Sequence, residues 1–188
     1  MNVCYRLKIF CSAILFLLAG GALSAQGVLG PFKWGGEKWN ATRERLVIYY
    51  IGGSGCPGCV CDATVAAVRT IKAEFAQKYP RYVVQFNLVC LDTNFWQAVT
   101  FIDKFGGGWD ELSIGNHFHN ELALRYLPQS RMPAVPHILV VRDTVAHEEK
   151  KGTHVRNRTL VADQVGPDEF EAWIQAGFPL QSPGTRLY

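Results

Sequence analysis

Two cysteines separated by two residues, Cys56 and Cys59, are the side chains of this 188-residue sequence best suited to chemistry. They follow an apolar run and a glycine-rich loop, and apolar residues at helical spacing follow them as far as Tyr79. A cysteine at a helix start lies near unpaired N–H groups and the positive end of the helix dipole, which favour the thiolate. Because the thiolate is the form that attacks a disulfide, the motif predicts thiol–disulfide exchange.

The elements that position this motif follow from hydrophobic periodicity. Residues 46–51 predict a strand, and Pro57 suits the first turn of a helix that stops at Pro80. Residues 82–91 predict a second strand, apolar on most positions as in a strand covered on both faces. This order predicts a right-handed βαβ unit with parallel strands.

The second half of the chain predicts further elements around a long connection. A first helix, which ends at three glycines, carries Phe95, Val99, Ile102 and Phe105 on one face. Residues 121–127 predict a second, short helix. Residues 137–141 then predict a strand, residues 142–158 a polar loop and residues 159–162 an antiparallel return strand. Residues 167–176 predict a closing helix with an acidic start.

The N-terminus has the pattern of a signal peptide. Arg6 and Lys8 precede an apolar stretch at residues 9–18, and small residues follow at 20–25. We therefore expect cleavage and a periplasmic or secreted location, with an uncleaved membrane anchor as the alternative. The expected organisation is a signal peptide (1–25), an N-terminal extension (26–45), one folded domain (46–178) and a C-terminal tail (179–188).

Cleavage changes both the charge and the cysteine count. Removing Arg6 and Lys8 leaves 17 Lys and Arg against 16 Asp and Glu, and a net charge of +1 gives no reason to expect nucleic acid as a partner. Four cysteines remain after cleavage: Cys56, Cys59, Cys61 and Cys90. A domain of this size can bury enough apolar surface to fold without disulfides, so the cysteines are expected to serve chemistry.

The order of these elements resembles the thioredoxin superfamily over roughly residues 40–178, and its specific motifs are Cys56-Pro57-Gly58-Cys59 and Val135-Pro136. The resemblance implies a thioredoxin-like α/β fold, in which helices flank a central mixed β-sheet and a helical insertion precedes the cis-proline strand. It also implies that the peptide bond before Pro136 is cis and that this proline lies against the active cysteines.

The resemblance further implies a mechanism. Cys56 is the nucleophile that forms a mixed disulfide with a substrate protein, and Cys59 resolves it. The residues implied to contact the substrate are Pro57, Gly58, Val135 and Pro136. The implied partners are proteins with cysteines or disulfides and a redox protein that recycles the pair. No organic cofactor is implied.

The sequence Cys-Pro-Gly-Cys-Val-Cys-Asp is similar to the exported thioredoxins of cytochrome c maturation, which carry a glutamate at the position of Asp62. The resemblance therefore makes Asp62 the candidate proton carrier for Cys59; a carboxylate that stabilises the helix start is the alternative. Asp62 and the insertion favour a reductant, whereas the proline after Cys56 and the valine before Pro136 occur in exported oxidases; a reductant is slightly favoured. The chain departs from the family at Tyr50, where cytosolic thioredoxins have a buried acid, and at Gly55, where a tryptophan is common.

Cys61 and Cys90 are a second pair whose state the sequence leaves open. Cys61 follows the motif directly, and Cys90 ends the neighbouring predicted strand at the same edge of the sheet. The pair could form a second disulfide, exchange with the active pair, or remain as two free thiols.

Two other classes of function compete with redox chemistry. The four cysteines, together with His117, His119 and His137, could hold copper or zinc, although three cysteines within six residues of a helix start do not have the spacing of a four-cysteine zinc site. A redox-inactive binding module is the other alternative, and the intact Cys56 and Cys59 oppose it.

Overall fold

The computed structural model describes residues 42–116, 120–148, 152–181 and 184–187. The predicted signal peptide, and the predicted extension up to residue 41, lie outside the described residues. In the described part of the chain, no helix is long and apolar enough to cross a membrane.

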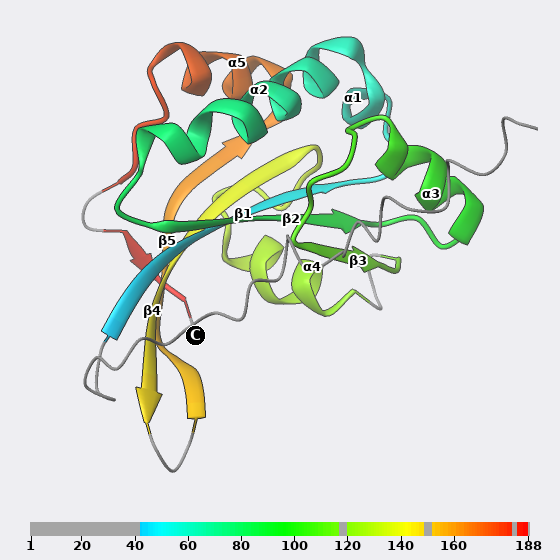
Figure 1. The fold of residues 1–188 in the computed structure, drawn as a ribbon. Helices are drawn as coiled ribbons and strands as arrows, with labels where there is room; N and C mark the ends of the chain where they lie inside the picture. The colour runs from blue at the N-terminus through cyan, green and yellow to red at the C-terminus, as the bar shows by residue number, and fades with distance from the viewer. Residues whose placement is uncertain (1–41, 117–119, 149–151, 182–183, 188) are drawn as a thin grey trace, which may run out of the picture. The chain divides into compact units, whose positions relative to one another are not determined.

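Within the described residues, strands form one six-stranded sheet in the order β3-β2-β1-β4-β5-β6 (Figure 1). The strands are β1 (Thr42–Gly52), β2 (Val83–Cys90), β3 (Glu111–Ile114), β4 (His137–Glu148), β5 (Gly152–Val165) and β6 (Thr185–Arg186). The helices are α1 (Pro57–Val60), α2 (Asp62–Lys78), α3 (Phe95–Asp103), α4 (Glu121–Tyr126), the 3₁₀ turn η2 (Leu127–Gln129) and α5 (Gly166–Gln175).

The sheet is mixed, and β1 lies at the boundary between its parallel and antiparallel parts. β1 pairs in parallel with β2, and β2 with β3, whereas β4 runs antiparallel to both β1 and β5. The predicted βαβ unit is therefore confirmed, as is the expected α/β architecture of a central mixed sheet flanked by helices. The pairing of Ile51 with His137 brings the end of β1 and the start of β4 to the same edge of the sheet.

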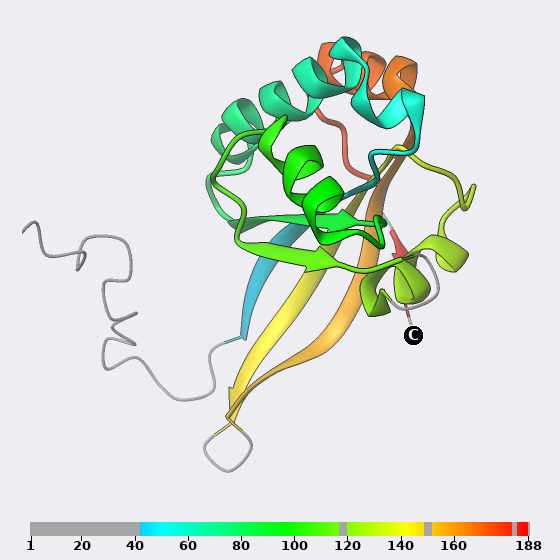
Figure 2. The same ribbon diagram turned by 90° about the vertical axis from the view of Figure 1, so that its right-hand side faces the viewer.

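The two faces of the sheet bury separate cores. Figures 1 and 2 show α2 and α5 on one face and α4 on the other. In β1, Leu46, Ile48 and Tyr50 face the first core, and Val47, Tyr49 and Ile51 face the second. Because successive side chains of a strand point to opposite faces, burial of both faces explains the unbroken apolar run at these positions.

The long polar stretch that follows the start of β4 has a different structure from the one expected from the sequence. Residues 142–158 were expected to form a loop, but β4 extends to Glu148 and β5 starts at Gly152, so the two strands form a long hairpin that projects past β1 (Figure 1). Asp143 is fully buried and accepts hydrogen bonds from Arg45 of β1 and Arg158 of β5. These ion pairs link three strands and stabilise a polar sequence in the sheet. Hydrophobic periodicity cannot reveal ion pairs between residues that are distant in sequence.

Three smaller differences concern the helical regions. The predicted insertion also contains the edge strand β3. The helix expected to begin at Pro57 is interrupted at Cys61, whose backbone is extended between α1 and α2. In α3 the buried positions are Ala98 and Phe101, whereas Phe95 and Val99, expected on the apolar face, are exposed.

The ion pairs of Asp143 generate a prediction about stability. Replacing Asp143 with Ala would leave the two arginines without their buried carboxylate, so the free energy of unfolding should fall by about 3 kcal/mol. Asp103→Ala, at an exposed carboxylate, should change it by less than about 0.5 kcal/mol. Urea unfolding of both variants measures the difference, and equal small losses would contradict the structural role of Asp143.

Candidate active site

The Cys-x-x-Cys motif begins at the N-cap of α1 and continues through its first turn, with its two sulfurs in different environments. Cys56 is the N-cap residue of α1, and its half-buried sulfur accepts a hydrogen bond from the Cys59 N–H at 3.2 Å. Pro57 is exposed at the first helical position, where a missing N–H has no cost. Cys59 is completely buried. The arrangement presents one sulfur to the surface and holds the other in the core.

Burial has a direct effect on the acidity of Cys59. Desolvation is the largest cause that raises the pKa of its thiol far above the ordinary value, and the hydrogen bond with Cys56 adds to it. Cys59 is therefore a protonated thiol at neutral pH and must lose its proton before it can attack another sulfur.

The loop before β4 lies against the motif. The Val135–Pro136 peptide bond is cis, as the family resemblance implies. The Cys56 thiol lies 3.6 Å from the Val135 carbonyl oxygen, which can accept its hydrogen bond. A Cβ atom placed on Gly58 would lie 3.3 Å from Cδ of Pro136, so a larger side chain at this position would press on the proline. The structure thus brings Cys56 and Gly58 against Val135 and Pro136, which lie far from them in sequence.

Below the motif, Gly52 and Tyr50 shape the space around Cys59. A Cβ atom on Gly52 would lie 3.1 Å from the Tyr50 hydroxyl oxygen and 3.3 Å from Sγ of Cys59, so only glycine leaves room for the sulfur. The Tyr50 hydroxyl donates a hydrogen bond to the Cys59 carbonyl at 2.9 Å. Burial raises the pKa of Tyr50 well above its usual value, which keeps the hydroxyl a neutral donor. The hydrogen bond from Tyr50 therefore helps to fix the position of Cys59.

A buried carboxylate does lie near Cys59, but it belongs to Asp92. Its oxygens accept hydrogen bonds from the Ser54 N–H and hydroxyl at 2.9–3.0 Å and from the Cys90 thiol at 3.3 Å. The negative charge of Asp92 is one of the causes that raise the pKa of Cys59. Sequence analysis missed this residue. The sequence feature that could have identified Asp92 is its position just after β2, because the ends of neighbouring parallel strands meet at one edge of the sheet.

Asp62, the candidate proton carrier, has a different environment. It is exposed in the first turn of α2, where a carboxylate interacts favourably with the helix dipole. This location favours the alternative interpretation of Asp62 as a helix-start residue.

The other two cysteines are free thiols with separate neighbours. The half-buried Cys61 thiol lies 3.3 Å from the Gly58 carbonyl and 3.4 Å from the Thr64 hydroxyl, and the hydrogen bond with Thr64 is the first cause that lowers its pKa. Cys90 is completely buried, and burial raises its pKa to about 12. The second disulfide considered from the sequence is thus not formed in the structure described here.

His137, which follows the cis-proline, is buried, and both of its ring nitrogens have hydrogen-bond partners. Its buried ring has Nδ1 at 3.0 Å from the Ala134 carbonyl oxygen and Nε2 at 2.6 Å from Oδ1 of Asp163. Burial raises the pKa of Asp163, but hydrogen bonds from His137 and the Arg131 N–H outweigh it, so the pKa lies below its usual value. Both contacts tie the loop that carries Val135 to β5.

A metal centre finds no support in this arrangement. Among the described residues, no group of three or more His, Cys, Asp and Glu side chains is placed to hold a metal ion. His117 and His119, considered as ligands from the sequence, lie outside the described residues.

The environments of Cys61 and Cys90 predict different reactivities. In the reduced protein at pH 7.5, iodoacetamide should modify Cys61 at least about tenfold faster than Cys90, because Cys61 is accessible and its pKa is lowered. Peptide mass spectrometry over a time course measures both rates, and the Cys56→Ser background removes the accessible thiol of the active pair. Equal rates, or protection of both by one disulfide, would contradict the structure.

Comparisons with known proteins are sparse. The sequence matches no protein-family model and no curated protein. The structure is similar to the crystal structure of a protein from Chlorobium tepidum provisionally described as thiol:disulfide interchange protein DsbE, over 70% of this chain and 76% of that chain, with a TM-score of 0.41 and 15% sequence identity.

Proposed function

We propose that this chain is an exported thiol–disulfide oxidoreductase that acts on protein cysteines through Cys56 and Cys59. The observation that carries the proposal is the pairing of a half-buried Cys56 sulfur at the start of α1 with a buried Cys59 thiol one turn away. The Val135 carbonyl beside Cys56 supports a role for the cis-proline loop in holding a substrate segment next to the reacting sulfur.

The proposed reaction has two exchange steps. The Cys56 thiolate attacks one sulfur of a substrate disulfide, which forms a mixed disulfide and releases the other substrate sulfur as a thiolate that takes a proton from solvent. Cys59 then loses its proton and attacks the Cys56 sulfur, which releases the second substrate thiolate. The substrate gains two electrons and the protein ends with a Cys56–Cys59 disulfide, which a redox partner protein must reduce for another cycle.

Asp92 is the proposed acceptor of the Cys59 proton. Its buried carboxylate is near enough to affect the pKa of Cys59, and the hydrogen bonds from Ser54 hold it in position. Asp62 is exposed and Tyr50 is a donor to the Cys59 carbonyl, so neither has the same relation to the thiol. A base is required because a thiol with a strongly raised pKa is a poor nucleophile.

Reduction of substrate disulfides is the proposed direction, in line with the resemblance to the exported thioredoxins of cytochrome c maturation. The periplasm or the extracellular space is the proposed location, after removal of residues 1–25. Copper or zinc binding, the alternative from the sequence, is not proposed because the described donors form no suitable group.

Substitution of the two cysteines tests the proposal. Cys56→Ser should abolish the reduction of insulin by dithiothreitol-recycled protein, because the attacking sulfur is lost. Cys59→Ser should accumulate mixed disulfides, which non-reducing electrophoresis detects. Cys61→Ser is the matched control and should retain most of the activity. Full turnover by Cys56→Ser would overturn the proposed function.

A second prediction isolates the proton acceptor. Asp92→Asn keeps an oxygen for the Ser54 hydrogen bonds but removes the base, so resolution of the mixed disulfide should slow at least about tenfold while the first attack changes little. Rapid acid quenching with mass spectrometry follows both steps. Asp62→Asn is the control; a slow second step in that variant, with normal resolution in Asp92→Asn, would transfer the role to Asp62.

A further inference from the structure

The loop before β4, residues 131–136, is held at both ends by one carboxylate. At the start of the loop, the Arg131 N–H donates to Oδ2 of Asp163 at 2.6 Å. Just after its end, Nε2 of His137 lies 2.6 Å from Oδ1 of the same carboxylate. The loop carries the carbonyl oxygen that lies beside the Cys56 thiol. Asp163 and His137 thus form a clasp around the segment that faces the reacting sulfur.

The clasp lies out of water. His137 is completely buried, and the side chain of Asp163 is 8% exposed. Away from water, hydrogen bonds between charged groups are stronger, and an unpaired polar group is costly. The two residues therefore stabilise each other in this arrangement and resist movement of the loop that they hold.

Both ring nitrogens of His137 face acceptors. Nδ1 lies 3.0 Å from the Ala134 carbonyl oxygen, and Nε2 faces the carboxylate. Burial raises the pKa of Asp163, but its hydrogen bonds lower it below the usual value, so this group is ionised and has no hydrogen to donate. The ring therefore needs a hydrogen on each nitrogen, which is the imidazolium form. Asp163 balances the charge of this ring.

The charged side chains beside the clasp, Arg131 and Glu169, form a separate ion pair. Nη2 of Arg131 lies 2.9 and 2.6 Å from the two carboxylate oxygens of Glu169. The two side chains are 61% and 39% exposed, so their attraction contributes little to holding the loop. On β1, the residue opposite His137 is Ile51, which carries no charge. Asp163 is thus the carboxylate on which the imidazolium depends.

We propose that Asp163 and His137 are positioning residues of the substrate site. The clasp keeps residues 131–136 in the conformation that places the Val135 carbonyl beside Cys56, where a substrate segment meets the reacting sulfur. Without the clasp, a substrate must order this loop as it binds, and that cost weakens its affinity. The proposal rests on the thiol–disulfide exchange proposed above, because the substrate concerned is a protein disulfide.

Steady-state kinetics of insulin reduction separates positioning from catalysis. Asp163→Ala removes the carboxylate at both ends of the loop and should raise the KM for insulin about tenfold, with kcat changed less than about threefold. Asp163→Asn is the conservative variant, because its amide oxygen can accept from the Arg131 N–H and its NH2 group can donate to Nε2 of a neutral ring. Its KM should stay within about threefold of the wild-type value. Circular dichroism shows whether each variant is folded.

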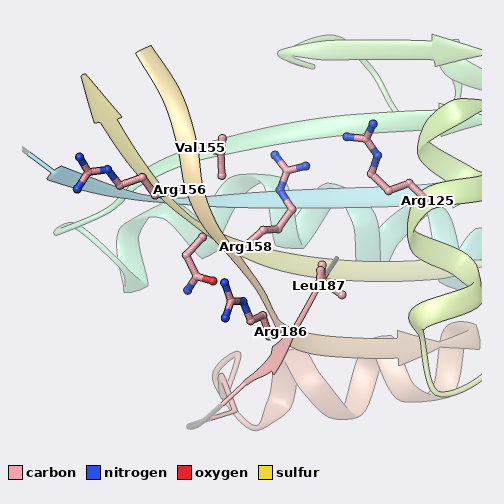
Figure 3. Close-up of a pocket in the computed structure, with 7 residues that line it drawn as sticks. Arg125, Val155, Arg156, Arg158, Arg186 and Leu187 are labelled. Carbon is pink, nitrogen blue, oxygen red and sulfur yellow. The ribbon is translucent and has the colours of Figure 1, made fainter. Parts of the chain in front are cut away.

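Asp143→Ala is the matched control, because it also removes a buried carboxylate that links strands. Its partner Arg158 lines the pocket shown in Figure 3. Arg158 precedes Asp163 by five residues in β5, or roughly 16 Å along the strand. Asp143→Ala should lose stability but change the KM less than about twofold. An equal rise of the KM in Asp143→Ala and Asp163→Ala would indicate general destabilisation and overturn the proposal.

Nitrogen-15 NMR of the histidine rings tests the clasp independently of activity. In the reduced full chain at neutral pH, both ring nitrogens of His137 should carry a hydrogen, whereas in Asp163→Asn only one should. The signal that is absent from His137→Gln assigns the ring. A neutral His137 ring in the wild type, or an unchanged KM in an active Asp163→Ala variant, would overturn the positioning role alone. A wild type that does not reduce insulin would instead reject the proposed function.

Discussion

The antiparallel pairing of β1 with β4 is the constraint on which the candidate site depends. Because Ile51 lies opposite His137, the turn after β1 and the loop before β4 meet at one edge of the sheet. Cys56 and Val135 are 79 residues apart in sequence, yet their sulfur and carbonyl oxygen are 3.6 Å apart. A shift of one residue in this register would turn the side chains of β1 to the opposite faces and separate the two loops. The two apolar cores that bury both faces of β1 oppose such a shift.

Around this edge, buried polar groups are satisfied in ways that also order the cysteines. Tyr50 donates to the Cys59 carbonyl, Asp92 accepts from Ser54 in the turn before the motif, and His137 holds the Ala134 carbonyl. Buried polar groups are costly unless they are hydrogen-bonded, so each contact stabilises one loop conformation. The same contacts make the two cysteines different. The half-buried Cys56 sulfur is accessible to a substrate, whereas the fully buried Cys59 sulfur needs a base before it can react.

Local signals predicted much of this structure. The apolar run of β1, the proline at the first turn of α1 and the residues of α5 are encoded within short windows, and the cis peptide bond at Pro136 followed from the family resemblance. Features set by distant partners were not predictable. Asp92 gains its place near Cys59 only because β2 pairs with β1, and the polar β4–β5 hairpin depends on Asp143 meeting arginines from two other strands. The break at Cys61 is different, because its contacts are local: the Thr64 hydroxyl donates to the Gly58 carbonyl at 2.7 Å.

The central claim is that Cys56 and Cys59 cycle between a dithiol and a disulfide. The most direct measurement is the reduction potential of this pair, obtained by equilibrating the protein in glutathione or dithiothreitol buffers and counting free thiols at each cysteine by mass spectrometry. We expect one two-electron couple confined to Cys56 and Cys59, near the thioredoxin value of about −270 mV, with Cys61 and Cys90 remaining free. Failure of this pair to form a disulfide across the range from about −320 to −120 mV would contradict it.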